Sequence, residues 1–296
     1  MILIVFPLLI LICGLVFCCL AFGHLPGYLI KKHPVVITPA DGGGIRIMSC
    51  NVRYLEIRDF GKKSWFFRAD KLLDDIAKQA PGVIGFQEVT KWQFDYLVDT
   101  MPGYDCVITY RDDTKRSEGC PVFFNTALYT LIDKGSFWLS ETPEVMSKDW
   151  DSGCYRVCSY VILTDIASGK NFVVFNTHLD HASDEARING IHVVLDKIAQ
   201  FGDLPAVIMG DFNAEEGSVT YNNVTEHFLD ARYETENTTG AGTFQAWGQL
   251  EGGRRIDYFM ISKTGFNVLR YDVVDIVHDG AYVSDHSPIV LDVILH

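Results

Sequence analysis

The stretch VIMGDFNAEEGS, residues 207–218, places a carboxylate and an amide directly after a run of apolar residues. With Ala206 before it, this run is typical of a buried strand that ends at Gly210. Asp211 and Asn213 then follow at the mouth of the strand. A lone Gly-Asp-x-Asn sequence is often structural, because Asp and Asn side chains bond the local backbone in turns. The rest of the chain must therefore decide between a turn and a functional site.

Short apolar or alternating stretches predict strands on both sides of this motif. They lie at residues 45–54, 82–89, 120–125, 127–139, 156–165, 171–180, 255–262 and 288–295. Amphipathic helices are predicted at residues 68–80 and 185–201 from the spacing of their apolar residues. Several strands follow one another without a helix between them. We therefore expect an α+β fold with two packed sheets and helices outside.

The composition supports one folded domain with a sizeable core, because 48% of the 296 residues are apolar and 21% are charged. The formal net charge of -13 argues against a strong general attraction to nucleic acid or anionic lipid. Any phosphate-bearing substrate must therefore be attracted locally, by a metal ion or by a few arginines. The eight cysteines have no spacing typical of a disulfide scaffold or a structural zinc site.

The first 22 residues contain no charged side chain, and a helix of this length can cross a hydrocarbon layer of about 30 Å. We therefore expect residues 1–30 to be an N-terminal transmembrane anchor or signal. Residues 31–44 are expected to be a linker, and residues 45–296 the catalytic domain. The protein is then expected at a membrane, as a monomer with a single N-terminal span. The two lysines after this segment are too few to decide which side the domain faces.

Residues that can bind a metal ion or a phosphate recur at the predicted strand ends and in the loops beside them. They are Asn51, Glu88, Glu118, His178, Asp211, Asn213, Asp257, Asp285 and His286. Each has an ordinary structural explanation by itself, such as a solvated strand end, a core histidine or a turn cap. Asp257 is the hardest to explain in this way, because it precedes the apolar stretch YFMI and an unpaired buried carboxylate is costly. We therefore expect Asp257 to have a partner such as a histidine.

The chemistry that such a set supports is the hydrolysis of phosphate esters. Carboxylate oxygens such as those of Glu88 suit Mg²⁺ or Mn²⁺, which bind a few carboxylates together with water and substrate phosphate. A histidine paired with a carboxylate can take or give a proton near neutral pH. Amides and further histidines can stabilise the charge that develops on phosphate oxygens.

Six motifs also carry a family resemblance: MSCNVRY, GFQEV, NTHLDH, GDFNAE, RRIDYFM and SDHSPIV. Their order and approximate spacing resemble those of the endonuclease/exonuclease/phosphatase superfamily, from about Ile45 to Leu295. The resemblance implies a deoxyribonuclease I-like fold, a four-layer α/β/β/α sandwich of two packed sheets flanked by helices. With its apolar N-terminus, the chain is similar to an uncharacterised bacterial membrane-anchored branch of that superfamily.

The same resemblance implies a role for each residue near the metal and the scissile phosphate. Glu88 would be the principal ligand of Mg²⁺ or Mn²⁺, with Asn51 and Asp285 close to the ion. Asp211 and Asn213 would orient the attacking water and the phosphate. The opening question thus has an expected answer, since in-line displacement at phosphorus tolerates little misplacement of either group.

The resemblance also implies the groups that handle protons and charge. His286, paired with Asp257, would be the acid/base histidine, and His178 would donate to a phosphate oxygen. Glu118 would stand where the nuclease branch orients such a histidine, and Arg156 where that branch often contacts phosphate. Family members divide the role of general base between the aspartate of GDFN and the histidine of SDH, and both alternatives stay open here.

The substrate is also left open among phosphate esters. We predict a divalent-metal-dependent phosphoesterase, most similar to the nucleases. The first alternative is a membrane-tethered phosphatase or phosphodiesterase of inositol phosphate or phospholipid headgroups, and the weakest is a non-catalytic binding module. The acidic composition favours a small ester or a single strand over a long duplex, because a duplex nuclease needs basic side chains around its groove.

Overall fold

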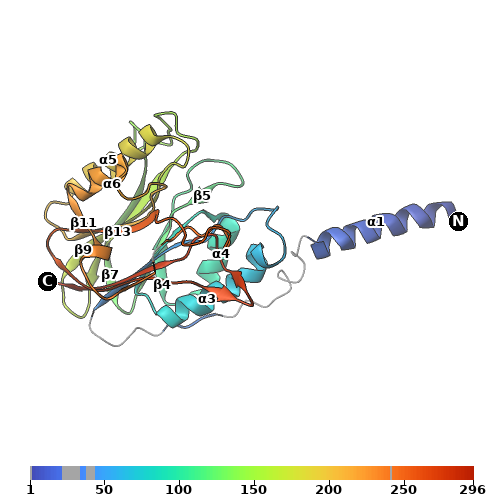
Figure 1. The fold of residues 1–296 in the computed structure, drawn as a ribbon, viewed down its shortest axis with the longest axis horizontal. Coiled ribbons are helices and arrows are strands. Elements are labelled where there is room, and N and C mark those ends of the chain that lie inside the picture. The colour runs from blue at the N-terminus through green and yellow to red at the C-terminus, as the bar shows by residue number, and fades with distance from the viewer. Residues whose placement is uncertain (1, 22–33, 38–43, 241) are drawn as a thin grey trace.

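The structure is a computed structural model that describes residues 2–21, 34–37, 44–240 and 242–296. All elements except the first helix, α1 (Ile2–Ala21), fall in the last two of these segments. Figure 1 shows the domain that they form, with the C-terminus at its edge.

The structure gives no support to the transmembrane anchor predicted for residues 1–30. In the described part of the chain, no helix has both the length and the apolar character that crossing a membrane requires. Residues 22–30 lie outside the described residues.

Part of the linker predicted for residues 31–44 packs on the domain. The N–H of Val35 donates to the backbone oxygen of Thr100 at 2.9 Å, and Ile37 is buried in a hydrophobic cluster. Residues 31–33 and 38–43 of this predicted linker lie outside the described residues.

Two large sheets form the centre of the domain. The seven-stranded sheet has the strand order β12 (Thr238–Thr239), β14 (Phe266–Val273), β17 (Ile289–Leu295), β1 (Ile45–Asn51), β2 (Val83–Gln87), β6 (Val122–Asn125) and β4 (Tyr104–Val107). The six-stranded sheet has the order β11 (Phe228–Asp230), β13 (Asp257–Ser262), β10 (Ala206–Asp211), β9 (Asn171–His178), β8 (Val157–Asp165) and β7 (Tyr129–Trp138). Two short pairs accompany them: β3 (Val89–Thr90) with β5 (Glu118–Gly119), and β15 (Val277–His278) with β16 (Ala281–Tyr282).

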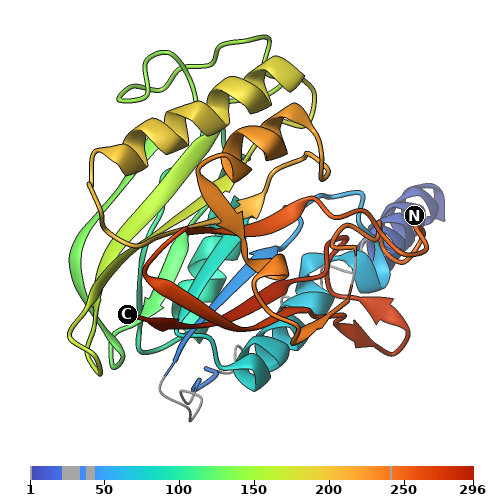
Figure 2. The ribbon, with the colours of Figure 1, turned by 60° about the vertical axis from the view of Figure 1, so that its left-hand side comes forward.

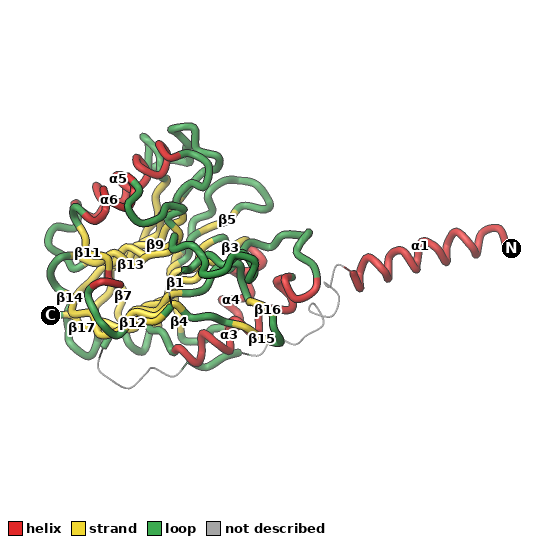
Figure 3. The backbone as a smooth tube through the Cα atoms, viewed as in Figure 1, coloured by secondary structure: helices red, strands yellow, loops and turns green. Residues whose placement is uncertain are grey.

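Helices cover the outer face of each sheet, as the red helices on either side of the yellow strands in Figure 3 show. Helices α3 (Trp65–Gln79) and α4 (Lys91–Thr100) cover the seven-stranded sheet, and α5 (Asp184–Ala199) and α6 (Val219–Thr225) cover the six-stranded sheet. In the turned view of Figure 2, α5 and α6 lie next to each other over the strands. Two single 3-10 turns, η1 (Gly61–Lys63) and η2 (Ala231–Tyr233), complete the elements. The predicted α+β sandwich of two sheets flanked by helices is confirmed.

Three hydrophobic clusters fill the three spaces between these four layers. In β1, Ile47 enters the cluster between the sheets, whereas its neighbour Met48 enters the cluster under α3 and α4. In β10, Val207 likewise enters the cluster between the sheets and Ile208 the cluster under α5 and α6. Successive side chains of a strand point to opposite faces, so each central strand contributes to two layers of core.

The same alternation points four polar residues into the space between the sheets. Asn51, His178, Asp211 and Asp257 each stand an even number of residues from apolar members of the inter-sheet cluster on their own strand. Each lies at one end of its strand, where the apolar cluster stops. The inter-sheet core therefore becomes polar at one edge.

The directions of the strands bring these ends together. Strands β9 and β10 are parallel and β13 is antiparallel to β10, so the start of β13 lies where the other two strands end. In register, Asp211 is paired with His178 on one side and with Asp257 on the other. In the second sheet, β1 and β2 are parallel and β17 is antiparallel to β1, so His286, just before β17, reaches the same edge.

A buried polar layer lies between the apolar cluster and this edge. Gln87 donates from Nε2 to Oδ1 of Asn176 at 2.6 Å, which joins β2 of one sheet to β9 of the other, and to Oγ of Ser49 at 3.1 Å. The amide of Asn176 donates in turn to the backbone oxygen of Phe86 at 2.8 Å. Gly85 permits this close approach, because a Cβ there would lie 2.7 Å from Cγ of Asn176.

Gly210 in the opening motif is required by the pairing of β9 and β10. Its φ is 136°, and a Cβ at this position would lie 1.9 Å from the backbone oxygen of Thr177. Only glycine adopts this conformation without strain. The glycine of GDFN thus lets Asp211 leave the strand at its observed position.

Candidate active site

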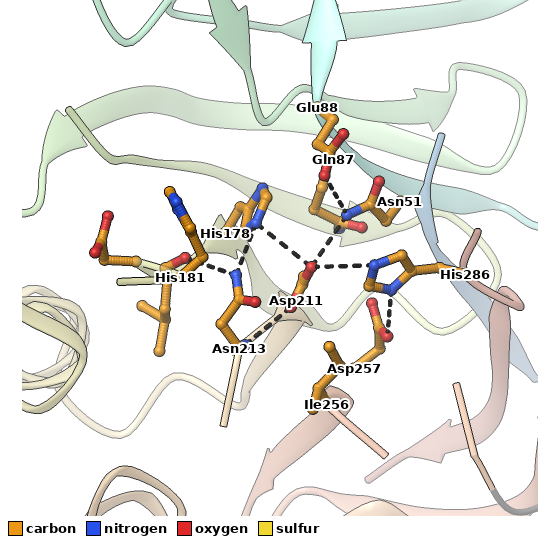
Figure 4. A network of polar contacts seen from close by, with 12 residues as sticks. Asn51, Gln87, Glu88, His178, His181, Asp211, Asn213, Ile256, Asp257 and His286 are labelled. Atoms are coloured by element: carbon orange, nitrogen blue, oxygen red, sulfur yellow. Dashed lines mark hydrogen bonds and ion pairs between the residues drawn. The ribbon is translucent and has the colours of Figure 1, made fainter. Parts of the chain in front are cut away.

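Asp211 lies at the centre of the polar edge, and Figure 4 shows the network around it. The amide Nδ2 of Asn51 lies between two carboxylates, 3.0 Å from Oδ2 of Asp211 and 3.1 Å from Oε1 of Glu88. Asn51 and Glu88 come from the seven-stranded sheet, whereas Asp211 comes from the six-stranded sheet. The two sheets therefore each supply part of one site.

His286 and Asp257 form the pair that the sequence predicts. Nδ1 of His286 is 2.8 Å from Oδ2 of Asp257, and Nε2 of the same ring is 3.6 Å from Oδ2 of Asp211. Burial acts to lower the pKa of His286, but the carboxylates of Asp257 and Asp211 outweigh it and raise the pKa to about 10. His286 is therefore positively charged at neutral pH.

The surroundings of Asp211 favour its neutral, protonated form. Its burial raises the pKa of the carboxyl to about 7, and the charges of Asp257 and Glu88 add to this effect against the opposing effect of His286. A carboxylate whose pKa lies near neutral pH can accept and release a proton under ordinary conditions.

His178 and Asn213 form a second pair on the other side of Asp211. The Asn213 amide Nδ2 is 2.9 Å from Nε2 of His178, which lies 3.4 Å from Oδ2 of Asp211. Burial, together with the charges of Arg156 and Arg111, holds the pKa of His178 well below its usual range. The neutral ring accepts from Asn213 at Nε2 in this arrangement, and the same amide donates its other N–H to the backbone oxygen of Leu179 at 3.1 Å.

Two residues of the site have left-handed backbone conformations. The φ angle is 62° at Glu88 and 48° at Asn213, a region that non-glycine residues seldom occupy. Local hydrogen bonds hold both, from Tyr54 N–H to Oε2 of Glu88 at 2.9 Å and from Asn213 N–H to Oδ1 of Asp211 at 2.9 Å. Such strain is typical of functional sites, where the surrounding structure fixes the side chain.

Asp285 lies on the side of Glu88. Its Oδ2 is 3.8 Å from Nη1 of Arg53, and the adjacent Ser284 donates to the backbone oxygen of Asn51 at 2.6 Å. Burial raises the pKa of Asp285, and the nearby charge of Glu88 acts in the same direction. Asp285 and Glu88 are therefore close enough for their charges to interact.

The predicted metal ligands fit a divalent cation. Glu88, Asp211 and Asp285 bring negative charge together at this edge. Nδ2 of Asn51 donates to two of these carboxylates, and its Oδ1 accepts from the N–H of Arg53 at 3.0 Å. Burial and mutual repulsion raise the pKa values of Asp211 and Asp285, and a bound cation relieves both effects.

A second group of ligand atoms overlaps with the predicted set. One atom each from Asp211, Asp257 and His286 lies within 4.8 Å of the others. Oδ2 of Asp257 already accepts from His286, so these two residues satisfy each other. A cation at Glu88 and Asp285, next to Asn51, stays a prediction, and Asp211 lies between this group and the Asp257–His286 pair.

Glu118 does not join the histidines in the described network. Arg111 donates to both of its carboxylate oxygens, at 2.7 and 2.9 Å. The predicted orientation of His178 by Glu118 is thus replaced by a carboxylate–guanidinium pair, and Asn213 bonds the histidine instead.

Arg156, predicted to contact phosphate, is buried and engaged by protein groups. Its Nε donates to Oδ2 of Asp180 at 3.3 Å and its Nη2 to Nδ1 of His181 at 2.9 Å. Asp180 also accepts from the backbone N–H of Ala182 at 2.9 Å. Arg156 therefore positions the loop after β9 and acts on the site mainly through its charge.

Several residues of the site and its support have no role in the sequence-based hypothesis. They are Arg53, Arg68, Arg111, Gln87, Asn176 and His181. A signal existed for Gln87 and Asn176, because each is polar at an inward position of an apolar strand. The others lie in stretches with ordinary polar patterns, and only folding brings them to the site.

The fold and the site together define a class of protein: a two-sheet sandwich with carboxylates, amides and two histidines gathered at one edge of the sheets. The sequence profile of the Endonuclease/Exonuclease/phosphatase family matches residues 48–286. The chain belongs to this family, whose members are hydrolases of phosphate esters and generally use divalent metal ions. Its place in a bacterial membrane-anchored branch stays a prediction.

Similar proteins include both phosphatases and nucleases. A family protein of Bacteroides vulgatus is 31% identical, with a TM-score of 0.81 over 86% of this chain and all of that chain. The mannosyl-6-phosphatase of Bacteroides thetaiotaomicron is 28% identical, with a TM-score of 0.78 over 85% of this chain and all of that chain. The CCR4-Not complex 3'-5'-exoribonuclease subunit Ccr4 of Yarrowia lipolytica is 23% identical over 222 residues, 55% of this chain and 31% of that protein.

Proposed function

We propose that the protein is a divalent-metal-dependent phosphoesterase that hydrolyses a small phosphate ester by in-line attack of water. One observation carries this proposal: Asn51, Glu88 and His286, at strand ends of the seven-stranded sheet, meet Asp211 and Asp257 of the six-stranded sheet around a single point. A non-catalytic role would not require left-handed strain at Glu88 or a buried charged histidine.

In this mechanism, Asp211 orients the attacking water and accepts one of its protons. The water oxygen forms a bond to phosphorus while the bond from phosphorus to the alcohol oxygen breaks. His286, charged and held by Asp257, gives its Nε2 proton to the departing oxygen, and the proton on Asp211 returns to it across 3.6 Å. Asn213, whose amide donates to Nε2 of His178 and to the backbone oxygen of Leu179, fixes the His178 ring beside the site.

Glu88 and Asp285 would hold the cation, next to Asn51, whose Nδ2 donates to the carboxylates of Glu88 and Asp211. When bound, Mg²⁺ or Mn²⁺ supplies stabilisation of the negative charge on the phosphate oxygens. The positive charge of the cation also offsets the repulsion between the carboxylates of the site.

Two observations favour a small ester over a nucleic acid. The chain has a net charge of -13, and arginines near the site are paired: Arg53 with Asp59, Arg111 with Glu118, and Arg156 with Asp180. Nucleic-acid binding depends on cations that are free to neutralise successive phosphates. The similarity to a mannosyl-6-phosphatase supports the same choice.

A nuclease is the second candidate. The similarity to Ccr4 exoribonuclease subunits favours it, and it is the activity that the sequence motifs suggest most directly. Both candidates use the same catalytic residues, so they differ only in what the surrounding surface accepts.

The experiment compares the full chain with Glu88→Gln on 4-nitrophenyl phosphate and bis(4-nitrophenyl) phosphate with Mg²⁺ or Mn²⁺. Glu88→Gln keeps the shape but removes the charge, so kcat/KM should fall by at least about a hundredfold. The exposed Glu234 gives a matched control, and Glu234→Gln should retain full activity. Activity that survives EDTA, or survives in Glu88→Gln, would contradict the proposal.

A further inference from the structure

A groove lies beside the catalytic residues, between the start of α5 and the loop that leads into α6. Its volume is about 490 Å³, in the range of small-molecule sites. Its lining includes His181, Arg187, Glu215 and Arg254, together with Asn213 of the site itself. Because Asn213 belongs to both, a phosphate ester bound at the site can extend its alcohol part into this α5–α6 groove.

The hydrogen bond from Arg156 fixes which ring nitrogen of a neutral His181 carries the hydrogen. Nη2 of Arg156 is 2.9 Å from Nδ1 of His181, and a guanidinium can only donate. Nδ1 therefore accepts, and a neutral His181 carries its hydrogen on Nε2. His181 is exposed and lies beside Asn213 in Figure 4. It thus supplies a pre-set hydrogen-bond donor at the wall of the groove.

The cations of the groove are already paired. Nη1 of Arg254 lies 3.6 Å from Oε1 of Glu215, and Arg187 contacts Asp184. The wall of the groove therefore presents both hydrogen-bond donors and acceptors, and the charges of its arginines are balanced by those of Glu215 and Asp184. Such a surface suits neutral hydroxyl groups better than a second phosphate.

The groove also lacks a platform for a nucleobase. No Phe, Tyr or Trp is among the described residues that line it. The nearby Phe244 has its ring 5.0 Å from the ring of His286 and 5.2 Å from the guanidinium of Arg254. Proteins that hold single strands stack bases on exposed aromatic rings, and here the nearby ring is already in contact.

We propose that the α5–α6 groove binds the alcohol part of the substrate, that this part is a small ring with several hydroxyl groups, as in a cyclitol or sugar phosphate, and that His181 selects for those hydroxyl groups. The inference rests on the proposed phosphoesterase function and adds the class of substrate. Arg156, through its bond to Nδ1, is the positioning residue for this selection.

The test uses two esters with six-membered rings that differ in hydroxyl groups, myo-inositol 1-phosphate and cyclohexyl phosphate. The wild-type chain should prefer the hydroxylated ester in kcat/KM by at least about tenfold, because its hydroxyl groups pair with His181 and the other polar groups of the groove wall, whereas the bare ring makes no hydrogen bonds there. His181→Ala should reduce this preference to about threefold or less, measured as the ratio of kcat/KM for the two ring esters. His181→Gln, which keeps a donor, should restore most of the preference.

His192 provides a matched control, because it is also exposed and bonded by an amide, that of Asn223, but it does not line the groove. His192→Ala should keep the wild-type preference. An unchanged preference in His181→Ala, or faster cleavage of a single-stranded oligonucleotide than of either ring ester, would overturn the inference while 4-nitrophenyl phosphate hydrolysis still upholds the phosphoesterase. If no ester is cleaved, both proposals fail.

Discussion

Arg68 gives the sharpest test of how the site is supported. It is buried with 1% of its surface exposed, and its guanidinium donates to the backbone oxygens of Val52, Arg53, Lys63 and Val283. These contacts join the segment after Asn51 to the segment before Asp285. Arg68→Met removes the donors but keeps most of the apolar stem.

The magnitude follows from the four acceptors. A buried acceptor without a partner costs about 1–3 kcal/mol, so four would give roughly 4–12 kcal/mol. The acceptors of Arg53 and Lys63 are only part-buried, which favours the low end of this range. Removing the guanidinium also removes the cost of burying its charge, which lowers the pKa of Arg68 to about 10. We therefore expect the low end, about 4 kcal/mol of unfolding free energy, or roughly 8–16 °C in Tm for a domain of this size.

The assay is thermal and urea unfolding, followed by Mg²⁺-dependent hydrolysis of 4-nitrophenyl phosphate below the new Tm. Because Asn51 and Asp285 lose a common support, the folded variant should also need more Mg²⁺ for half-maximal activity. The exposed Arg116 supplies the control Arg116→Met, which should change stability by less than about 0.5 kcal/mol. If Arg68→Met costs less than about 1 kcal/mol, the guanidinium is not the clamp described here.

The remaining predictions concern the histidine pair and the motif glycine. His286 has a raised pKa, so its stabilising contribution is complete below pH 6.5 and is lost as the pH rises towards about 10. In EDTA, Asp257→Asn should therefore be most destabilised relative to wild type below pH 6.5, and a gap that widens towards pH 10 would be the wrong sign. Gly210→Ala should cost more than about 4 kcal/mol, because its Cβ would meet Thr177 at 1.9 Å. Gly217→Ala, with φ 77° but open space, should cost only about 1 kcal/mol in the same urea titration.

The sequence predicts the central strands well because their side chains face apolar layers on both sides. The apolar runs before Asp211 and after Asp257 become β10 and β13, and the helix predicted for residues 185–201 corresponds to α5 (Asp184–Ala199). Strand β14 and helices α4 and α6 are not predicted, since half-exposed segments carry a weak pattern. Their apolar residues become visible as core only once the neighbouring sheet is in place.

The site divides in the same way. The pairing of His286 with Asp257 can be predicted because an apolar stretch follows Asp257 in the sequence, and a carboxylate buried there needs a partner. The contact of Asn51 with Asp211 depends on how two sheets stack, and no local pattern reports that distance. The pairing of Arg111 with Glu118 and of Arg156 with His181 depends on loop paths for the same reason.

The amide layer beneath the site has a consequence for how this protein can change. Because the two halves of the site belong to different sheets, a shift of one sheet relative to the other would move Asn51 away from Asp211. The buried hydrogen bond from Gln87 to Asn176 joins the two sheets beneath the site and opposes that shift. The sequences of the loops around the site can therefore change to accept substrates with different alcohol parts, while this hydrogen bond keeps the catalytic residues in place.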